Sequence, residues 1–230
     1  MTDRSGLLVL ISGRGTNLLA LADAVRSGQL SEPILGVISD RPDAAGLDRA
    51  ADLGIDRICV DRAAHVDRAA FERSLSAAID GYEPRYIVLA GFMRVLSAEF
   101  VNARAGQMIN IHPSLLPRHR GLDTHRKALD AGDEVHGASV HFVTPALDGG
   151  PVISQARLRI KAGDTPDSLA ERLLPLEHQL LVSTTALLLE EAVEVRDEKI
   201  YVNEQALGSP YDLERDLAGR RSLDSATPIR

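Results

Sequence analysis

The chain has 230 residues, which is enough for one large domain or two small ones, and its hydrophobic fraction of 44% is ordinary for a globular protein. The net charge of −7 argues against a nucleic-acid-binding surface. The polar N-terminus does not resemble a signal peptide, and no apolar segment approaches the ~20 residues that span a bilayer. Cys59 has no second cysteine to pair with and is expected to be a small buried strand residue. We therefore expect a cytoplasmic protein with no membrane or nucleic-acid partner.

Strands and helices are predicted to alternate through the first half of the chain. Short apolar runs predict strands over Leu7–Ile11, Ile34–Ile38, Ile58–Val60 and Tyr86–Ala90. Helical spacing predicts helices from Leu18 to Gly28, over Gly46–Leu53 and over Val66–Ile79, with another beginning near the N-cap residue Ser97. This alternation favours one α/β domain with a Rossmann-like, mostly parallel sheet flanked by helices.

The second half continues with strands over Gln107–His112, Ala138–Val143 and Pro151–Ile160 and a helix over Thr124–Ala131. A long helix is predicted from Thr165 to about Glu191, with Pro175 as a kink or a boundary. Val193–Val195 and Lys199–Val202 are typical of a hairpin. From about Glu204 the chain is polar and aperiodic. The predicted organisation is a catalytic domain over residues 1–203 and a loose tail over 204–230.

The strand that ends at His112 carries two polar side chains that can do chemistry. Asn110 and His112 are two residues apart, so they project from the same face of the strand. Pro113 cannot donate a ladder hydrogen bond and is expected to end the strand. Open α/β sheets bind their ligands at the carboxyl ends of the strands. A buried, satisfied polar pair is the structural alternative.

The loop Ser12–Asn17 joins the first strand to the first helix and is a candidate phosphate site. Its two glycines let backbone N–H groups turn toward an anion at the helix N-terminus. Arg14, Thr16 and Asn17 supply further donors. The loop is neither a Walker motif nor a G-x-G-x-x-G fingerprint, so a dinucleotide is weakly supported. An ordinary tight turn is the alternative.

Asp148 follows the strand that ends at Val143 and is expected to lie over the end of the sheet, although Asp-Gly is also a common turn dipeptide. With Asn110 and His112 it forms a coherent catalytic set. The amide can stabilise an oxyanion, the imidazole can move a proton, and the carboxylate can orient the imidazole and favour its cationic form.

Five of the seven histidines fall between His112 and His141, a density that raises the alternative of a metal site. No H-E-x-x-H pattern or cysteine-rich ligand spacing is present, and no metal is predicted.

Five motifs together resemble the phosphoribosylglycinamide formyltransferases, folate-dependent enzymes of purine synthesis. They are Ser12–Asn17, Ala90–Leu96, Asn110–Pro117, His136–Val143 and Leu147–Ile153. The likeness extends from Leu7 to about Asn203. It implies a single-domain formyltransferase fold and transfer of the formyl group of 10-formyltetrahydrofolate to the amine of 5'-phosphoribosylglycinamide. The expected ligands are these two small molecules, without a metal, and a homodimer is compatible with the sequence.

The resemblance also implies roles for individual residues. It makes Asn110, His112 and Asp148 the catalytic triad, and it assigns the ribonucleotide to Gly15, Thr16, Asn17 and Glu177. It assigns folate binding to Arg68, Met93, Arg94, Val95, Leu96, Asn110 and Thr144.

One departure from the family pattern lies beside the expected site. Many members carry a histidine where this chain has Asp123, and His119-Arg120 replaces a more aromatic, proline-containing pair. We hypothesise that Asp123 adds a carboxylate near the site and changes how His112 titrates.

Three alternative functions differ from the expected formyl transfer to 5'-phosphoribosylglycinamide, either in their domains or in whether they need the catalytic triad. Methionyl-tRNA formyltransferase carries a C-terminal RNA-binding domain, whereas a short tail is expected here. Formyltetrahydrofolate hydrolase carries an N-terminal regulatory domain, for which the first strand at Leu7 leaves no room. A non-catalytic nucleotide-binding protein on the same scaffold has no need of Asn110, His112 and Asp148 as a set.

Overall fold

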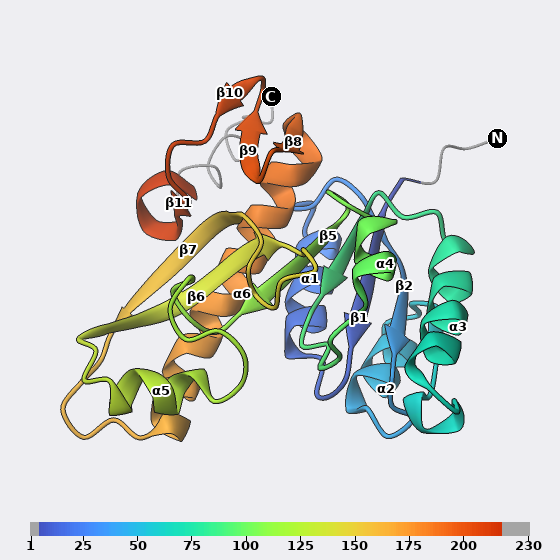
Figure 1. The fold of residues 1–230 in the computed structure, drawn as a ribbon, viewed down its shortest axis with the longest axis horizontal. Helices are drawn as coiled ribbons and strands as arrows, with labels where there is room; N and C mark the ends of the chain where they lie inside the picture. The colour runs from blue at the N-terminus through green and yellow to red at the C-terminus, as the bar shows by residue number, and fades with distance from the viewer. Residues whose placement is uncertain (1–4, 218–230) are drawn as a thin grey trace, which may run out of the picture.

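The computed structural model describes residues 5–217. An eight-stranded sheet runs through them in the order β11-β7-β6-β5-β4-β1-β2-β3 (Figure 1). Its strands are β1 (Leu7–Ile11), β2 (Ile34–Ser39), β3 (Arg57–Cys59), β4 (Tyr86–Leu89), β5 (Met108–His112), β6 (Val135–Phe142), β7 (Val152–Arg159) and β11 (Tyr211–Asp212). Neighbouring strands are parallel except at β5–β6 and β6–β7. The mostly parallel α/β fold expected from the alternation of elements is confirmed.

Helices cover both faces of this sheet (Figure 1). They are α1 (Thr16–Arg26), α2 (Ala45–Asp52), α3 (Arg68–Asp80), α4 (Ala98–Asn102), α5 (Thr124–Asp130) and α6 (Pro166–Glu190). Buried side chains of α1, α2 and α6 pack on one face, and those of α3 and α4 pack on the other. None of the helices within residues 5–217 is both long and apolar enough to cross a membrane.

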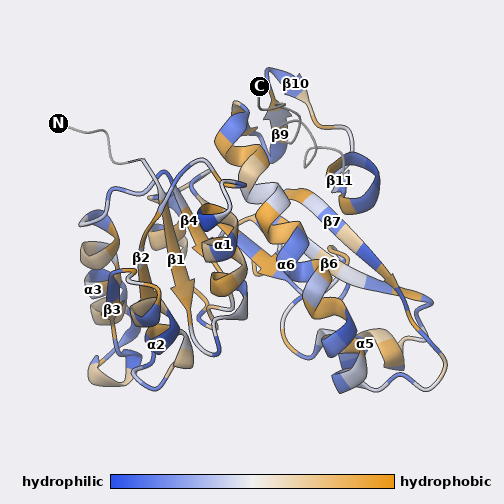
Figure 2. Cartoon of the chain, turned by 180° about the vertical axis from the view of Figure 1, so that it is seen from behind, coloured by the Kyte–Doolittle hydropathy of each residue, from blue (hydrophilic) through white to orange (hydrophobic). Residues whose placement is uncertain are grey.

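The central strand β1 shows why this layering forms. All five of its residues are fully buried, and the strand is hydrophobic throughout (Figure 2). Leu7, Val9 and Ile11 belong to one core cluster, whereas Leu8 and Leu10 belong to the other. Each such burial contributes roughly 1.5–3 kcal/mol. A strand with this pattern is stable only between two layers of helices.

The long helix expected from Thr165 to about Glu191 is confirmed as α6, and of the two alternatives at Pro175, a kink or a boundary, the boundary is wrong. The helix is 25 residues long and is not interrupted at Pro175. It begins with a capping box between Thr165 and Ser168. A proline inside a helix removes one hydrogen bond and costs about 3 kcal/mol. The buried side chains of Leu173 and Leu180, on either side of the proline, pack into the core and offset that cost.

The first part of the segment expected to be a loose tail forms secondary structure. After the predicted hairpin of β8 (Val193–Arg196) and β9 (Lys199–Val202), β10 (Gln205–Ala206) adds a third strand to the small sheet. Strand β11 then pairs with the edge strand β7, and a turn of π-helix at Leu213–Leu217 buries both of its leucines. The rest of the expected tail, 218–230, lies outside the described residues, and the boundary at residue 203 stays a prediction.

Cys59 also differs from expectation. It lies at the end of β3 as predicted, but its side chain is exposed because β3 is the outermost strand of the sheet.

Candidate functional site

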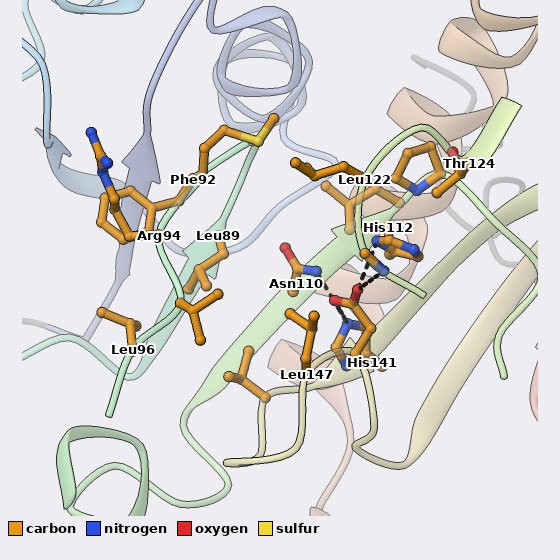
Figure 3. A pocket seen from close by; sticks show the side chains of 18 of the residues that line it. Leu89, Phe92, Arg94, Leu96, Asn110, His112, Leu122, Thr124, His141 and Leu147 are labelled. Carbon is orange, nitrogen blue, oxygen red and sulfur yellow. Dashed lines mark hydrogen bonds and ion pairs between the residues drawn. The ribbon is translucent and has the colours of Figure 1, made fainter. Parts of the chain in front are cut away.

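Asn110 and His112 extend from β5 into a cavity of about 570 Å³ at the carboxyl end of the parallel strands (Figure 3). Their shared face follows from the two-residue period of the strand. Strand β6 runs antiparallel beside them and places His141 opposite Asn110 and Ser139 opposite His112.

Both ring nitrogens of His112 face hydrogen-bond acceptors. Nδ1 lies 3.6 Å from Oδ2 of Asp148, and Nε2 donates to the backbone carbonyl of His119 at 3.1 Å. The ring is 6% exposed, and the side chain of Asp148 is 11% exposed. An imidazole nitrogen that carries a proton can present its N–H to either of these acceptors. His112 can therefore act as a proton donor in this setting.

The loop that follows β6 aims the Asp148 carboxylate at His112. Asp148 adopts a left-handed backbone conformation with φ of 44°, and its Oδ2 accepts from the backbone N–H of Gly121 at 2.7 Å. A Cβ at Gly150 would lie 1.9 Å from the carbonyl oxygen of Phe142, so the chain reverses there only with glycine. The Asp-Gly-Gly sequence is thus a tight turn and also the support of the carboxylate.

His141 orients the amide of Asn110, a role that the sequence did not indicate. Nδ1 of His141 faces the carbonyl oxygen of Phe142 at 2.9 Å and must carry the proton, because a carbonyl only accepts. Nε2 is then an acceptor for Nδ2 of Asn110 at 3.1 Å. Burial lowers the pKa of His141, outweighing the Phe142 hydrogen bond and the charge of Asp148, which raise it. The second N–H of the Asn110 amide remains available for a ligand.

The loop after His112 is held by a buried polar network. The Ser139 hydroxyl donates to the carbonyl of Ser114 at 2.7 Å and accepts from the backbone N–H of Leu116 at 3.0 Å. Nε2 of Gln155, on β7, donates to the Leu116 carbonyl at 2.9 Å. Buried networks that satisfy their members rigidify the surrounding chain. Strands β6 and β7 therefore fix the loop that leads away from His112.

The other half of the cavity is apolar. Leu89, Phe92 and Leu96 form its wall, while Met93 and Leu122 are exposed large side chains among its lining residues (Figure 3). Exposed apolar residues that gather around one cavity are typical of a ligand site. The cavity thus combines a polar end at Asn110 and His112 with a long apolar wall. This combination suits a ligand that has a conjugated ring system and one reactive polar group.

The expected phosphate loop lies next to this cavity. The backbone N–H of Ser12 donates to the carbonyl of Gly91, a lining residue, at 3.1 Å. Gly15 precedes α1 with φ of 70°, and no side chain caps this helix. A Cβ at Gly15 would lie 2.8 Å from the Cα of Gly46 in α2, so the close approach of the two helices requires glycine. The uncapped first turn of α1 leaves N–H donors for an anion.

Glu177 on α6 is joined to this loop by Asn17. Burial raises the pKa of Glu177 to about 7, and a hydrogen bond from the Asn17 side chain opposes the shift. The Oδ1 atom of Asn17 is buried and has no partner among the described residues. The pair therefore places a titratable carboxyl beside the N-terminus of α1.

The structure brings most of the predicted site residues together, but not all of them. The cavity is lined by eight of them: Met93, Arg94, Val95, Leu96, Asn110, His112, Thr144 and Asp148. Gly15, Thr16, Asn17, Glu177 and Arg68 do not line it. Asp123 does line it, yet no hydrogen bond or ion pair between Asp123 and His112 is found within residues 5–217.

The histidine cluster does not form a metal site in the described part of the chain, where no group of three or more His, Cys, Asp or Glu could hold an ion. His125 and His136 pair with each other instead, with Nδ1 and Nε2 3.0 Å apart. Burial, reinforced by the neighbouring histidines, lowers the pKa of His136 to about 4. Both rings are therefore neutral near pH 7.

Comparisons with known proteins agree with this geometry. The family described as Formyl transferase matches residues 6–185. Phosphoribosylglycinamide formyltransferase from Escherichia coli K12 is 49% identical over 76% of this chain and 82% of its own length, and the Haemophilus influenzae protein is 35% identical over 87% and 95%. The Coxiella burnetii enzyme structure aligns with a TM-score of 0.86 at 43% identity, covering 91% of this chain and 99% of that one.

Two further relatives mark the range of the family. The Bos taurus trifunctional purine biosynthetic protein adenosine-3 is 40% identical over 83% of this chain, which spans 19% of that larger protein. A formyltetrahydrofolate deformylase from Pseudomonas putida aligns with a TM-score of 0.78 at 26% identity, over 87% of this chain and 70% of that one. The family match extends over most of the chain, and the chain covers most of the length of the Escherichia coli and Haemophilus influenzae relatives. The chain therefore belongs to the phosphoribosylglycinamide formyltransferases of the formyl transferase family.

Proposed function

We propose that the protein transfers the formyl group of 10-formyltetrahydrofolate to the amine of 5'-phosphoribosylglycinamide. The observation that carries this proposal is the convergence of Asn110, His112 and Asp148 at the polar end of the cavity. An amide donor, an imidazole with two acceptors and a buried carboxylate are what acyl transfer to an amine requires. The folate and the ribonucleotide are co-substrates, and the reaction needs no metal.

The reaction begins when the lone pair of the substrate amine forms a bond to the formyl carbon. The carbonyl π electrons move onto the formyl oxygen, and the resulting oxyanion accepts hydrogen bonds from Asn110 and cationic His112. An electron pair of the oxyanion then re-forms the C=O bond as the C–N10 bond breaks. The electron pair of the broken bond goes to N10, and His112 passes a proton to that nitrogen. The proton lost by the attacking amine restores the imidazolium, so charge and protons balance. Asp148 holds the ring in place throughout.

The two substrates are proposed to approach the formyl group from different sides. The folate lies along the apolar wall of Met93, Val95 and Leu96, with Arg94, Thr144 and the more distant Arg68 as polar contacts. The ribonucleotide phosphate binds the N–H groups of Gly15, Thr16 and Asn17 at the start of α1, and Glu177 contacts the same ribonucleotide. The hydrogen bond between Ser12 and Gly91 keeps these two regions adjacent.

The acceptor separates this function from its rivals. Purified protein is incubated with 10-formyltetrahydrofolate, with and without 5'-phosphoribosylglycinamide, and deformylation of the folate is followed by absorbance. We expect deformylation only when the ribonucleotide is present. Deformylation in its absence would identify a hydrolase, and no reaction under either condition would identify a binding protein. The cytoplasm stays the predicted compartment, and sedimentation of the same sample tests the predicted compatibility with a homodimer.

A further inference from the structure

The irregular segment Phe92–Ser97 contributes its residues 92–96 to the lining of the cavity and is attached to the scaffold along its length. The backbone N–H of Met93 donates to the Ser12 hydroxyl at 2.8 Å, near its start. Arg94 pairs through Nε with the buried carboxylate of Asp40. Ser97, at its far end, is bound by Glu72 of α3. A segment without helix or strand hydrogen bonds depends on such contacts for its conformation.

Glu72 has the most partners of these anchors. The residue is 8% exposed, and its Oε1 accepts from Nε of Arg68 at 2.8 Å and from the backbone N–H of Ser97 at 2.7 Å. Its Oε2 accepts from the Ser97 hydroxyl. That hydroxyl in turn accepts from the backbone N–H of Phe100 at 3.1 Å and caps α4. One carboxylate thus ties an arginine of α3 to the end of the cavity wall.

The chemistry of this contact requires an ionised carboxylate. Burial raises the pKa of Glu72, but its hydrogen bonds from Arg68 and Ser97 together outweigh burial and hold the pKa below its ordinary value. Hydrogen bonds to a charged acceptor are about twice as strong as neutral ones and fix geometry accordingly. Replacing the carboxylate by an amide changes the charge at nearly constant shape.

The arginine is held in a way that leaves its outer edge available. Only Nε of Arg68 contacts Glu72, its side chain is half exposed, and its terminal nitrogens have no hydrogen-bond partner within residues 5–217. A guanidinium anchored through Nε presents its two terminal nitrogens as a fork, which matches a ligand carboxylate.

We propose that Glu72 is a positioning residue for the folate, orienting Arg68 toward the ligand's carboxylate tail and fixing the end of the wall Phe92–Ser97. The inference rests on the proposed function. Glu72 itself touches neither substrate and acts through Arg68 and Ser97. Its loss weakens folate binding while leaving the polar end of the cavity, and hence the chemical step, in place.

The test compares Glu72→Gln with Glu99→Gln, a matched control on α4 whose exposed carboxylate makes no side-chain hydrogen bond in the described chain. Glu72→Gln is expected to raise KM for 10-formyltetrahydrofolate roughly tenfold. Its kcat and its KM for the ribonucleotide are expected to stay within about twofold of wild type, and Glu99→Gln is expected to change none of these. An unchanged folate KM in Glu72→Gln, with or without a lower Tm, overturns the proposal.

A double-mutant cycle tests whether Glu72 acts through the arginine. Arg68→Ala alone is expected to raise the folate KM, and adding Glu72→Gln is expected to raise it by less than the product of the two single effects. A fully multiplicative effect means that the two residues act independently and overturns the proposal. If Glu72→Gln does not fold, Ser97→Ala is tested instead, and it is expected to raise the folate KM by a smaller factor. An unchanged folate KM in Ser97→Ala would likewise overturn the proposal.

Binding of tetrahydrofolate, measured by titration calorimetry, separates this proposal from the proposed function. If the wild-type protein shows no acceptor-dependent deformylation, the function fails, whereas the role of Glu72 is still read from the Kd. A weaker Kd in Glu72→Gln supports the proposal, and an equal Kd in both proteins contradicts it even when the enzyme is active.

Discussion

Asn110 donates an amide N–H to the unprotonated Nε2 of His141 across 3.1 Å, from one strand of the antiparallel pair β5–β6 to the other. The carbonyl of Phe142 fixes the tautomer of His141, and that tautomer fixes which end of the Asn110 amide faces the ring. An amide that is free to turn presents its oxygen to the formyl group half of the time. In the proposed reaction, His141 therefore belongs to the arrangement that stabilises the oxyanion.

Replacing His141 by Leu is expected to lower kcat about tenfold, because the Asn110 amide loses the acceptor that orients it. Substrate KM values are expected to change less than kcat, because an oxyanion donor acts mainly in the transition state. Steady-state kinetics and a thermal melt measure both effects. His141→Gln is the matched comparison, because its side-chain oxygen can accept in place of Nε2 and is expected to recover part of the rate. A leucine variant that matches wild type in kcat would remove His141 from the site.

Replacing His112 by Ala is expected to leave the fold intact and to lower kcat by orders of magnitude. The variant loses a donor to the oxyanion, typically worth ~3–4 kcal/mol of barrier, together with the group that moves the proton. Circular dichroism checks the fold, and single-turnover kinetics measure the chemical step. Turnover near the wild-type rate in a folded variant would sink the assignment of His112.

The sequence predicts those parts of the site that depend on local geometry. The side chains of Asn110 and His112 share a face because the period of a strand is two, whatever lies around it. The buried run Leu7–Ile11 indicates two covering layers for the same reason. The Ser97 cap is likewise a local signal, and its hydroxyl does accept from the N–H of Phe100.

The sequence does not predict contacts that depend on register or on packing between distant segments. His141 meets Asn110 because β5 and β6 pair in one register out of several that the apolar pattern allows. Strand β11 has two residues, too few to show a period, and exists through its pairing with β7. Pro175 reads as a helix boundary locally, and only the packing of α6 on the sheet outweighs that signal.

Glu177 is expected to make stability depend on pH. Its pKa is about 7 in the folded protein, against an ordinary value of 4.5, so the folded state holds a proton that the unfolded state has lost. The stabilisation is complete below pH 4.5 and is lost as pH rises through 7. At 1.36 kcal/mol per unit and with partial exposure, the loss is on the order of 2 kcal/mol.

Urea unfolding at pH 5 and pH 7.5 measures this loss, with Glu177→Gln as the variant that removes the titration. Relative to wild type, the variant is expected to be more stable at pH 7.5 than at pH 5. The same stability difference between the two proteins at both pH values would show that Glu177 does not titrate with a raised pKa.

The pair of Asp40 and Arg94 is expected to stabilise the fold as well as the cavity wall. The Asp40 side chain is 0% exposed, and its Oδ1 has no hydrogen-bond partner among the described residues. Arg94→Ala leaves that carboxylate buried without its cation, which costs about 2–4 kcal/mol. Arg41→Ala is the control, because Arg41 and Asp43 are exposed partners whose separation is expected to change the free energy of unfolding little. Equal unfolding free energies for the two variants would contradict this reasoning.

Asp123 remains a test of the electrostatics around His112. It is an exposed residue that lines the cavity and makes no hydrogen bond or ion pair with His112 in the described structure, so any influence acts through space. A nearby carboxylate favours the cationic form of an imidazole, which extends the activity of a histidine acid to higher pH. Asp123→His removes this negative charge and adds a group that is cationic at low pH.

The expected result is that the basic limb of the kcat profile differs between wild type and Asp123→His, because the substitution replaces a carboxylate that lines the cavity by an imidazole. The difference is expected to shrink at high ionic strength if part of the path between the two groups is hydrated. His112→Ala in the same background shows whether the limb belongs to His112, since the limb then disappears with the rate. Profiles that superimpose for wild type and Asp123→His would mean that Asp123 does not influence the charge on His112.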